Sequence, residues 1–149
     1  MQARTTIREI LEKKGHKVFS LPPDATVYEA IKIMAENSVG ALLVMEGEEL
    51  VGIISERDYA RKVILKGKSS KETAVREIMT SPVQVVVPDC TVGEAMSIMT
   101  NKRIRHLPVL EEGKVVGVVS IGDLVRSIVD EQAATIEHLH AYITGQYPG

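Results

Sequence analysis

An internal repeat constrains this chain more than any other feature. When the sequence is slid against itself by 65 positions, residues 18–64 align with residues 83–129 without a gap, and 17 of the 47 aligned residues are identical. The segments ahead of the repeats also match, since Ile7–Leu11 resembles Val75–Met79, with three extra residues before the first repeat. This pattern indicates a duplicated supersecondary unit, and a unit of about 47 residues has too little core to fold comfortably alone. We therefore expect two similar halves, related by a pseudo-twofold axis, that bury their sheets against each other.

The repeat divides the chain into five segments. We expect a lead-in over 1–17, the first repeat over 18–64, a polar linker over 65–82, the second repeat over 83–129 and a tail over 130–149. The tail keeps a helical apolar spacing, and such a stripe packs either on its own domain or on a second subunit. Its apolar positions are Ala133, Ile136, Leu139 and Ile143.

Each repeat has the pattern of a β-α-β-β-α unit, so the fold class we predict is α/β. A proline ends the first strand, a Thr-x-x-Glu capping box begins the next helix, and a short Gly-containing connection joins the following two strands as a hairpin. The expected strands are 18–21, 41–45 and 50–55 in the first repeat, and 83–87, 107–110 and 115–120 in the second.

A strand runs directly into the last helix of each repeat, through Gly52–Asp58 in the first and Gly117–Asp123 in the second. Both stretches read Gly-x-x-Ser-x-x-Asp, and a helix start offers free N–H groups and a positive dipole end to an anion. The Ser and Asp also suit an N-cap with its reciprocal N3 partner. A short carboxylate held there can in addition chelate a cis-diol, so capping alone and capping with ribose binding both remain open.

The helices that follow these junctions show apolar residues at helical spacing, which predicts one buried face for each. The positions are Tyr59, Ala60, Val63 and Ile64 in the first repeat, and Leu124, Val125, Ile128 and Val129 in the second.

Composition narrows the function classes. The formal net charge is −2, which gives no general attraction to nucleic acid or to an anionic membrane. One cysteine, Cys90, excludes an internal disulfide and suits a reducing compartment. No apolar run approaches the roughly 20 residues that a membrane-spanning helix needs. We expect a cytoplasmic protein with no nucleic-acid or membrane partner.

Several phrases in this sequence resemble those of paired CBS (cystathionine β-synthase) domains. The two Gly-x-x-Ser-x-x-Asp stretches are similar to the family's pattern, as are Met79–Pro82 ahead of the second repeat and Ile104–Val109 within it. The resemblance covers nearly the whole chain, which therefore looks like a stand-alone CBS pair.

The resemblance implies that adenosine-containing ligands bind in clefts between the repeats, and that two pairs join into a disc-shaped dimer. Carried over by position, Asp58 and Asp123 would hold ribose hydroxyls, while Ser55 and Ser120 would lie near the phosphates. The remaining candidate ligand-binding residues are Gly122, Ile104, Arg105, His106, Val39, Gly40, Ala41, Arg57, Lys17, Val18, Thr80, Pro82 and Val83.

The two clefts are not expected to be equivalent. Arg105 and His106 suit phosphate contacts, because a guanidinium offers paired donors and a protonated imidazole would be favoured beside phosphate. Gly40 and Ala41 replace this pair in the first repeat.

We therefore predict a non-catalytic regulatory sensor of AMP, ADP, ATP or a related adenosyl compound such as NAD or S-adenosylmethionine, with no required cofactor. No catalytic triad, paired carboxylate, Walker-type loop or metal-ligand pattern stands out in the sequence. The alternative is a ligand-free scaffold that dimerises and docks on an effector protein.

Overall fold

The computed structural model describes the backbone of residues 4–143 and the side chains of residues 4–133. The chain divides into two compact units. The first-repeat unit comprises residues 16–85 and 108–118, and the second-repeat unit takes its described residues from 4–15, 86–107 and 119–143.

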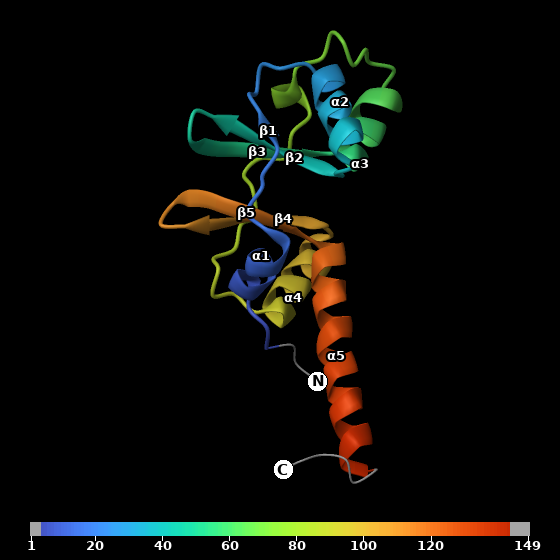
Figure 1. The fold of residues 1–149 in the computed structure, drawn as a ribbon. Coiled ribbons are helices and arrows are strands. Elements are labelled where there is room, and N and C mark those ends of the chain that lie inside the picture. The colour runs from blue at the N-terminus through green and yellow to red at the C-terminus, as the bar shows by residue number, and fades with distance from the viewer. Residues whose placement is uncertain (1–3, 144–149) are drawn as a thin grey trace. The chain divides into compact units, whose positions relative to one another are not determined.

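The first-repeat unit is built on a three-stranded sheet (Figure 1). Its strands are β1 (Ser20–Leu21), β2 (Ala41–Glu46) and β3 (Glu49–Ser55), in the order β1-β2-β3. β1 is parallel to β2, and the β2–β3 hairpin is antiparallel. The helices are α2 (Val27–Asn37), the short α3 (Glu56–Tyr59) and the π-helix η1 (Ala60–Ile64), with the 3-10 turn η2 (Val75–Glu77) after them.

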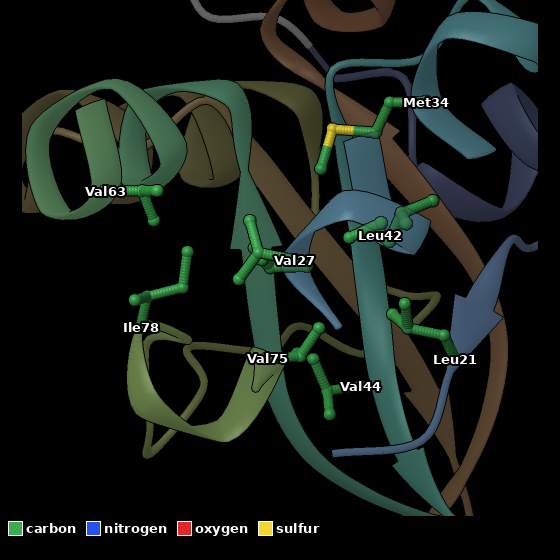
Figure 2. Packing of buried hydrophobic residues seen from close by; sticks show 10 residues of the cluster. Leu21, Val27, Met34, Leu42, Val44, Val63, Val75 and Ile78 are labelled. Atoms are coloured by element: carbon green, nitrogen blue, oxygen red, sulfur yellow. The ribbon is translucent and has the colours of Figure 1, made fainter. Parts of the chain in front are cut away.

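The core of this unit lies where α2, η1 and η2 bury apolar side chains against the sheet (Figure 2). Val27, Ala30 and Met34 form the buried stripe of α2, as their spacing predicts. Val75 and Ile78 come from the segment directly ahead of the second repeat, residues 73–79, which we call the second lead-in. They complete the cluster with Leu21, Leu42, Val44, Ile54 and Val63.

The second repeat supplies α4 (Val92–Lys102), the neighbouring strands β4 (His106–Glu111) and β5 (Lys114–Ser120), and the long α5 (Ile121–Ile143) (Figure 1). The chain's first helix, α1 (Ile7–Lys14), belongs to the same unit as α4 and α5. Thr91 caps α4 through the predicted box, in which Thr91 Oγ1 accepts from the backbone N–H of Glu94 at 3.1 Å.

Each lead-in pairs with the other repeat: the first lead-in with the second repeat, and the second lead-in with the first repeat. Residues 5–8 bond to residues 88–92 of the second repeat, while residues 73–76 bond to residues 23–27 of the first. The bonds correspond one to one: Ile7 N–H donates to Cys90 O at 2.8 Å, and Val75 N–H donates to Ala25 O at 2.8 Å. Each compact unit is therefore completed by the other repeat's lead-in.

Two sequence predictions about secondary structure and burial are wrong. The segment 83–87 forms no strand, and only Val86 makes an isolated bridge. Pro82 and Pro88 flank these five residues, and neither can donate a ladder hydrogen bond.

Only about half of the apolar positions predicted to be buried on the last helix of each repeat are buried or partly buried. Val63 and Leu124 are buried, whereas Ile64 and Val129 are 56% and 55% exposed. Val125 and Ala60 are also exposed. Adjacent helix positions differ by about 100°, so one layer of packing covers only one residue of each neighbouring pair.

The structure confirms that the last helix continues into the tail, since α5 runs unbroken from Ile121 to Ile143. Of the tail's apolar positions, Ala133 is exposed. The side chains of Ile136, Leu139 and Ile143 lie outside the described residues.

Candidate functional site

The two strand-to-helix junctions have the same local geometry. Ser55 N–H donates to Asp58 Oδ2 at 2.9 Å, and Asp58 N–H donates to Ser55 Oγ at 3.2 Å. The matching distances at Ser120 and Asp123 are 2.8 Å and 3.1 Å. Reciprocal capping is therefore confirmed at both junctions, and it fixes each carboxylate at the end of a strand.

The predicted ligand-binding segments that contain Gly40 and Arg105 lie beside these junctions. Glu56 N–H donates to Gly40 O at 3.1 Å, and Ile121 N–H donates to Arg105 O at 2.8 Å. Because the first and third N–H groups of each helix are used in this way, the helix ends offer an anion fewer donors than the sequence suggests.

A lysine from α1 reaches the second junction. Lys14 Nζ donates to Asp123 Oδ2 at 2.6 Å, and Arg126 Nη1 lies 3.7 Å from Asp123 Oδ1. The Asp123 side chain is only 11% exposed. Burial raises the pKa of Asp123, but the hydrogen bonds from Lys14 and Ser120 outweigh it and hold the pKa below its usual value. The carboxylate is thus kept ionised in a largely buried position.

The first junction uses a different lysine. Lys62 Nζ lies 3.1 Å from Asp58 Oδ1, one helical turn along the same helix, and also donates to Ile78 O at 2.9 Å. Ser55 Oγ donates to Asp58 Oδ2 at 3.0 Å. The second repeat has no lysine at the equivalent position, which Ser127 occupies.

His106 and Arg105 lie in the same unit as Asp123. Burial lowers the pKa of His106, the charges of Lys14 and Arg105 lower it further, and Asp123 opposes them. The neutral imidazole is therefore favoured when no anion is bound. Arg105 itself is exposed.

The other candidate residues of the first-repeat unit are only partly brought together. Ala41 pairs with Ser55 across β2 and β3, and Thr80 forms an antiparallel bridge with Ile53, two residues before Ser55. Lys17 lies 5.1 Å from the ring centroid of Phe19. Four further candidates belong to the same unit but have no hydrogen bond to Ser55 or Asp58 among the described residues: Val18, Val39, Pro82 and Val83.

A groove of about 490 Å³ lies between α1 and the start of α5, inside the second-repeat unit. Asp123 is the one predicted site residue that lines it, together with Lys14 and Arg126. Carboxylates of both helices add negative charge to its rim. The groove therefore opens onto one edge of the Asp123 junction and does not include the Ser120 hydroxyl or the His106 ring.

Sequence reasoning missed both lysines. Lys62 stands four residues after Asp58, which is the spacing of a helical ion pair and was a usable signal. No local spacing in the sequence marks Lys14. It reaches Asp123 because the first lead-in packs with the second repeat.

The sequence model of the CBS domain matches residues 7–65 and 75–130, which cover most of the chain and both repeats. The chain belongs to the CBS-domain family. It is 44% identical over 152 residues to the mitochondrial CBS domain-containing protein CBSX3 of Arabidopsis thaliana, covering 96% of this chain and 74% of that protein.

Solved CBS structures share the fold. A putative signal-transduction protein with CBS domains from Burkholderia ambifaria is 50% identical, with a TM-score of 0.84, over 86% of this chain and 96% of that one. The CBS domain pair of protein MJ0100, solved in complex with 5'-methylthioadenosine and S-adenosyl-L-methionine, is 26% identical, with a TM-score of 0.76, over 85% and 98% of the two chains. The predicted α/β fold of a CBS pair is thus confirmed, although the first strand of the second repeat is absent.

None of the helices within residues 4–143 is long and apolar enough to span a bilayer. Within residues 4–133, whose side chains the structure describes, His, Cys, Asp and Glu form no group of three that could hold a metal ion.

Proposed function

We propose that this CBS pair is a non-catalytic regulatory sensor that binds adenine nucleotides or related adenosyl ligands at the Ser55–Asp58 and Ser120–Asp123 junctions. The observation that carries the proposal is a largely buried carboxylate at each junction, fixed by its serine and neutralised by a lysine. The bound adenosyl compounds of the MJ0100 domain pair support the same ligand class.

The geometry suits a ribose diol. An ionised carboxylate accepts about four hydrogen bonds, so each Asp can receive two hydroxyl protons, one on each oxygen, once a side-chain donor moves from Oδ2. Backbone capping sets the carboxylate's direction before the ligand arrives, which lowers the entropy that binding must overcome. Arg105 and His106 would then contact the phosphate at the second junction.

A regulatory output requires that the ligand favour one conformation over another. The size of that signal is limited by the difference in affinity between the two conformations. Micromolar binding corresponds to about 8 kcal/mol, which is ample for a bias of a few kcal/mol.

A thermal-denaturation panel tests the proposal. The melting temperature is expected to rise with the concentration of AMP, ADP, ATP, NAD or S-adenosylmethionine, and guanosine monophosphate serves as the matched control. Product analysis after incubation with ATP is expected to show no turnover. If no adenosyl compound raises the melting temperature, the alternative of a ligand-free scaffold is favoured.

We also propose that the protein forms a homodimer through the exposed sides of its last helices. Ile64 and Val129 occupy equivalent positions in the two repeats, and each is more than half exposed, as would suit residues that a second copy covers. Val129→Glu is expected to yield a monomer in analytical ultracentrifugation. Val87→Glu, which alters another exposed valine, is expected to leave the dimer intact.

The compartment remains a prediction. One cysteine and an even charge balance suit the cytoplasm, while the CBSX3 relative is mitochondrial.

A further inference from the structure

The two junction carboxylates differ in what a ribose must displace, and this difference rests on the proposed function of both sites. At Asp123, Oδ2 already receives two donors, the Ser120 N–H and the Lys14 ammonium. A carboxylate oxygen has two lone pairs, so a diol that engages both oxygens must displace one of these donors. The backbone N–H is fixed by the cap, and therefore Lys14 must move.

At Asp58, the oxygen that already accepts two hydrogen bonds has different donors. Oδ2 receives the Ser55 N–H and the Ser55 hydroxyl, while Lys62 lies against Oδ1. A hydroxyl can rotate away from the carboxylate without moving any charge. Lys62 keeps a second acceptor at Ile78 O, 2.9 Å away, so it can stay in place and leave one lone pair of Oδ1 open.

The displaced groups therefore carry different charges. Moving a lysine from a carboxylate that is 11% exposed breaks a charge-assisted hydrogen bond, which is stronger than a neutral one. A ligand that carries its own phosphate gives the released ammonium a new anionic partner. An uncharged nucleoside gives it none.

The surroundings of Asp123 add to this bias. Arg126 lies 3.7 Å from the other carboxylate oxygen, and Arg105 belongs to the segment that bonds to the first residue of α5. Both guanidiniums repel a released ammonium and attract a phosphate, so they favour a ligand that carries one.

We propose that Lys14 makes the Asp123 site selective for anionic, phosphorylated adenosyl ligands, whereas the Asp58 site accepts uncharged adenosyl ligands nearly as well. Lys14 acts as a specificity-determining residue: it exchanges a carboxylate for a phosphate when the ligand binds. The two repeats then report on different ligands.

Calorimetry with AMP and adenosine tests this at fixed ionic strength. Asp58→Ala isolates the Asp123 site, and in that background AMP is expected to bind at least tenfold more tightly than adenosine. Adding Lys14→Met is expected to reduce the ratio to about two, because adenosine no longer has to displace the ammonium and AMP no longer gains it as a partner. Lys13→Met removes the same charge one residue earlier on α1 and is expected to leave the ratio within twofold of its starting value.

The reverse background gives the second arm. With Asp123→Ala, AMP and adenosine are expected to bind within about threefold of each other. An unchanged ratio in Lys14→Met, or an equal loss in Lys13→Met, overturns the assignment to Lys14 while leaving the nucleotide sites standing. Absence of binding by either ligand to the unaltered protein and to both backgrounds overturns the proposed function and this inference together.

Discussion

Lys14 Nζ lies 2.6 Å from Asp123 Oδ2, although the two residues are 109 positions apart in the chain. The contact exists because the first lead-in forms α1 and bonds to the second repeat. The corresponding lead-in of the second repeat forms only the 3-10 turn Val75–Glu77 and brings no lysine to Asp58. The duplicated halves have thus diverged at the cation that neutralises each acid.

The depressed pKa of Asp123 predicts how stability changes with pH. A carboxyl whose pKa is lower in the folded state stabilises the protein above its unfolded pKa, here about 3.8, and this contribution is lost as the pH falls through the folded value. Asp123→Asn is expected to reduce the free energy of unfolding by about 1 kcal/mol at pH 7, because a cap and an ion pair are weakened. Urea denaturation measures the change.

The difference between the unaltered protein and Asp123→Asn is expected to shrink below pH 4. Asp130→Asn, an exposed change one to two turns along α5, is the matched control and is expected to alter stability little at either pH. A difference that grows on acidification would contradict the ionised assignment of Asp123.

His106 is predicted to titrate below 6.5 when the protein is free of ligand, because burial and the charge of Lys14 both lower its pKa. Its contribution to stability is therefore present above pH 6.5 and is lost as the pH falls through the lower, folded pKa. Proton NMR of the imidazole measures the midpoint. Lys14→Met is expected to raise it and Asp123→Ala to lower it, and AMP is expected to raise it in the unaltered protein. A free-state midpoint above 6.5 would exclude this electrostatic account.

Gly52 is predicted to be a packing position for the second lead-in. A Cβ at this residue would clash with Sδ of Met79 and lie 3.3 Å from its Cβ. Gly52→Ala is expected to destabilise the protein by about 1–3 kcal/mol through overpacking. In a double-mutant cycle, Met79→Ala should make the Gly52→Ala change nearly neutral. Additive effects of the two changes would show that Met79 does not press on this strand.

The repeat and its hairpins could be predicted because they depend on local patterns: alternation, capping residues and Gly-containing turns. The Ser55–Asp58 and Ser120–Asp123 caps were readable for the same reason, since each involves residues three apart. The Lys14–Asp123 contact could not be predicted from the sequence, because it depends on which repeat each lead-in packs with. Burial was overestimated at Ile64 and Val129, since helical spacing marks an apolar stripe without stating how much of it the core covers.

The central claim is that Asp58 and Asp123 each hold the sugar of an adenosyl ligand, and titration calorimetry with AMP tests it most directly. The unaltered protein is expected to bind at two classes of site per chain. Asp123→Ala should abolish the tighter class, Asp58→Ala the weaker one, and the double variant should release no binding heat while keeping its cooperative unfolding. Binding of AMP by the folded double variant with the affinity and stoichiometry of the unaltered protein would contradict the account.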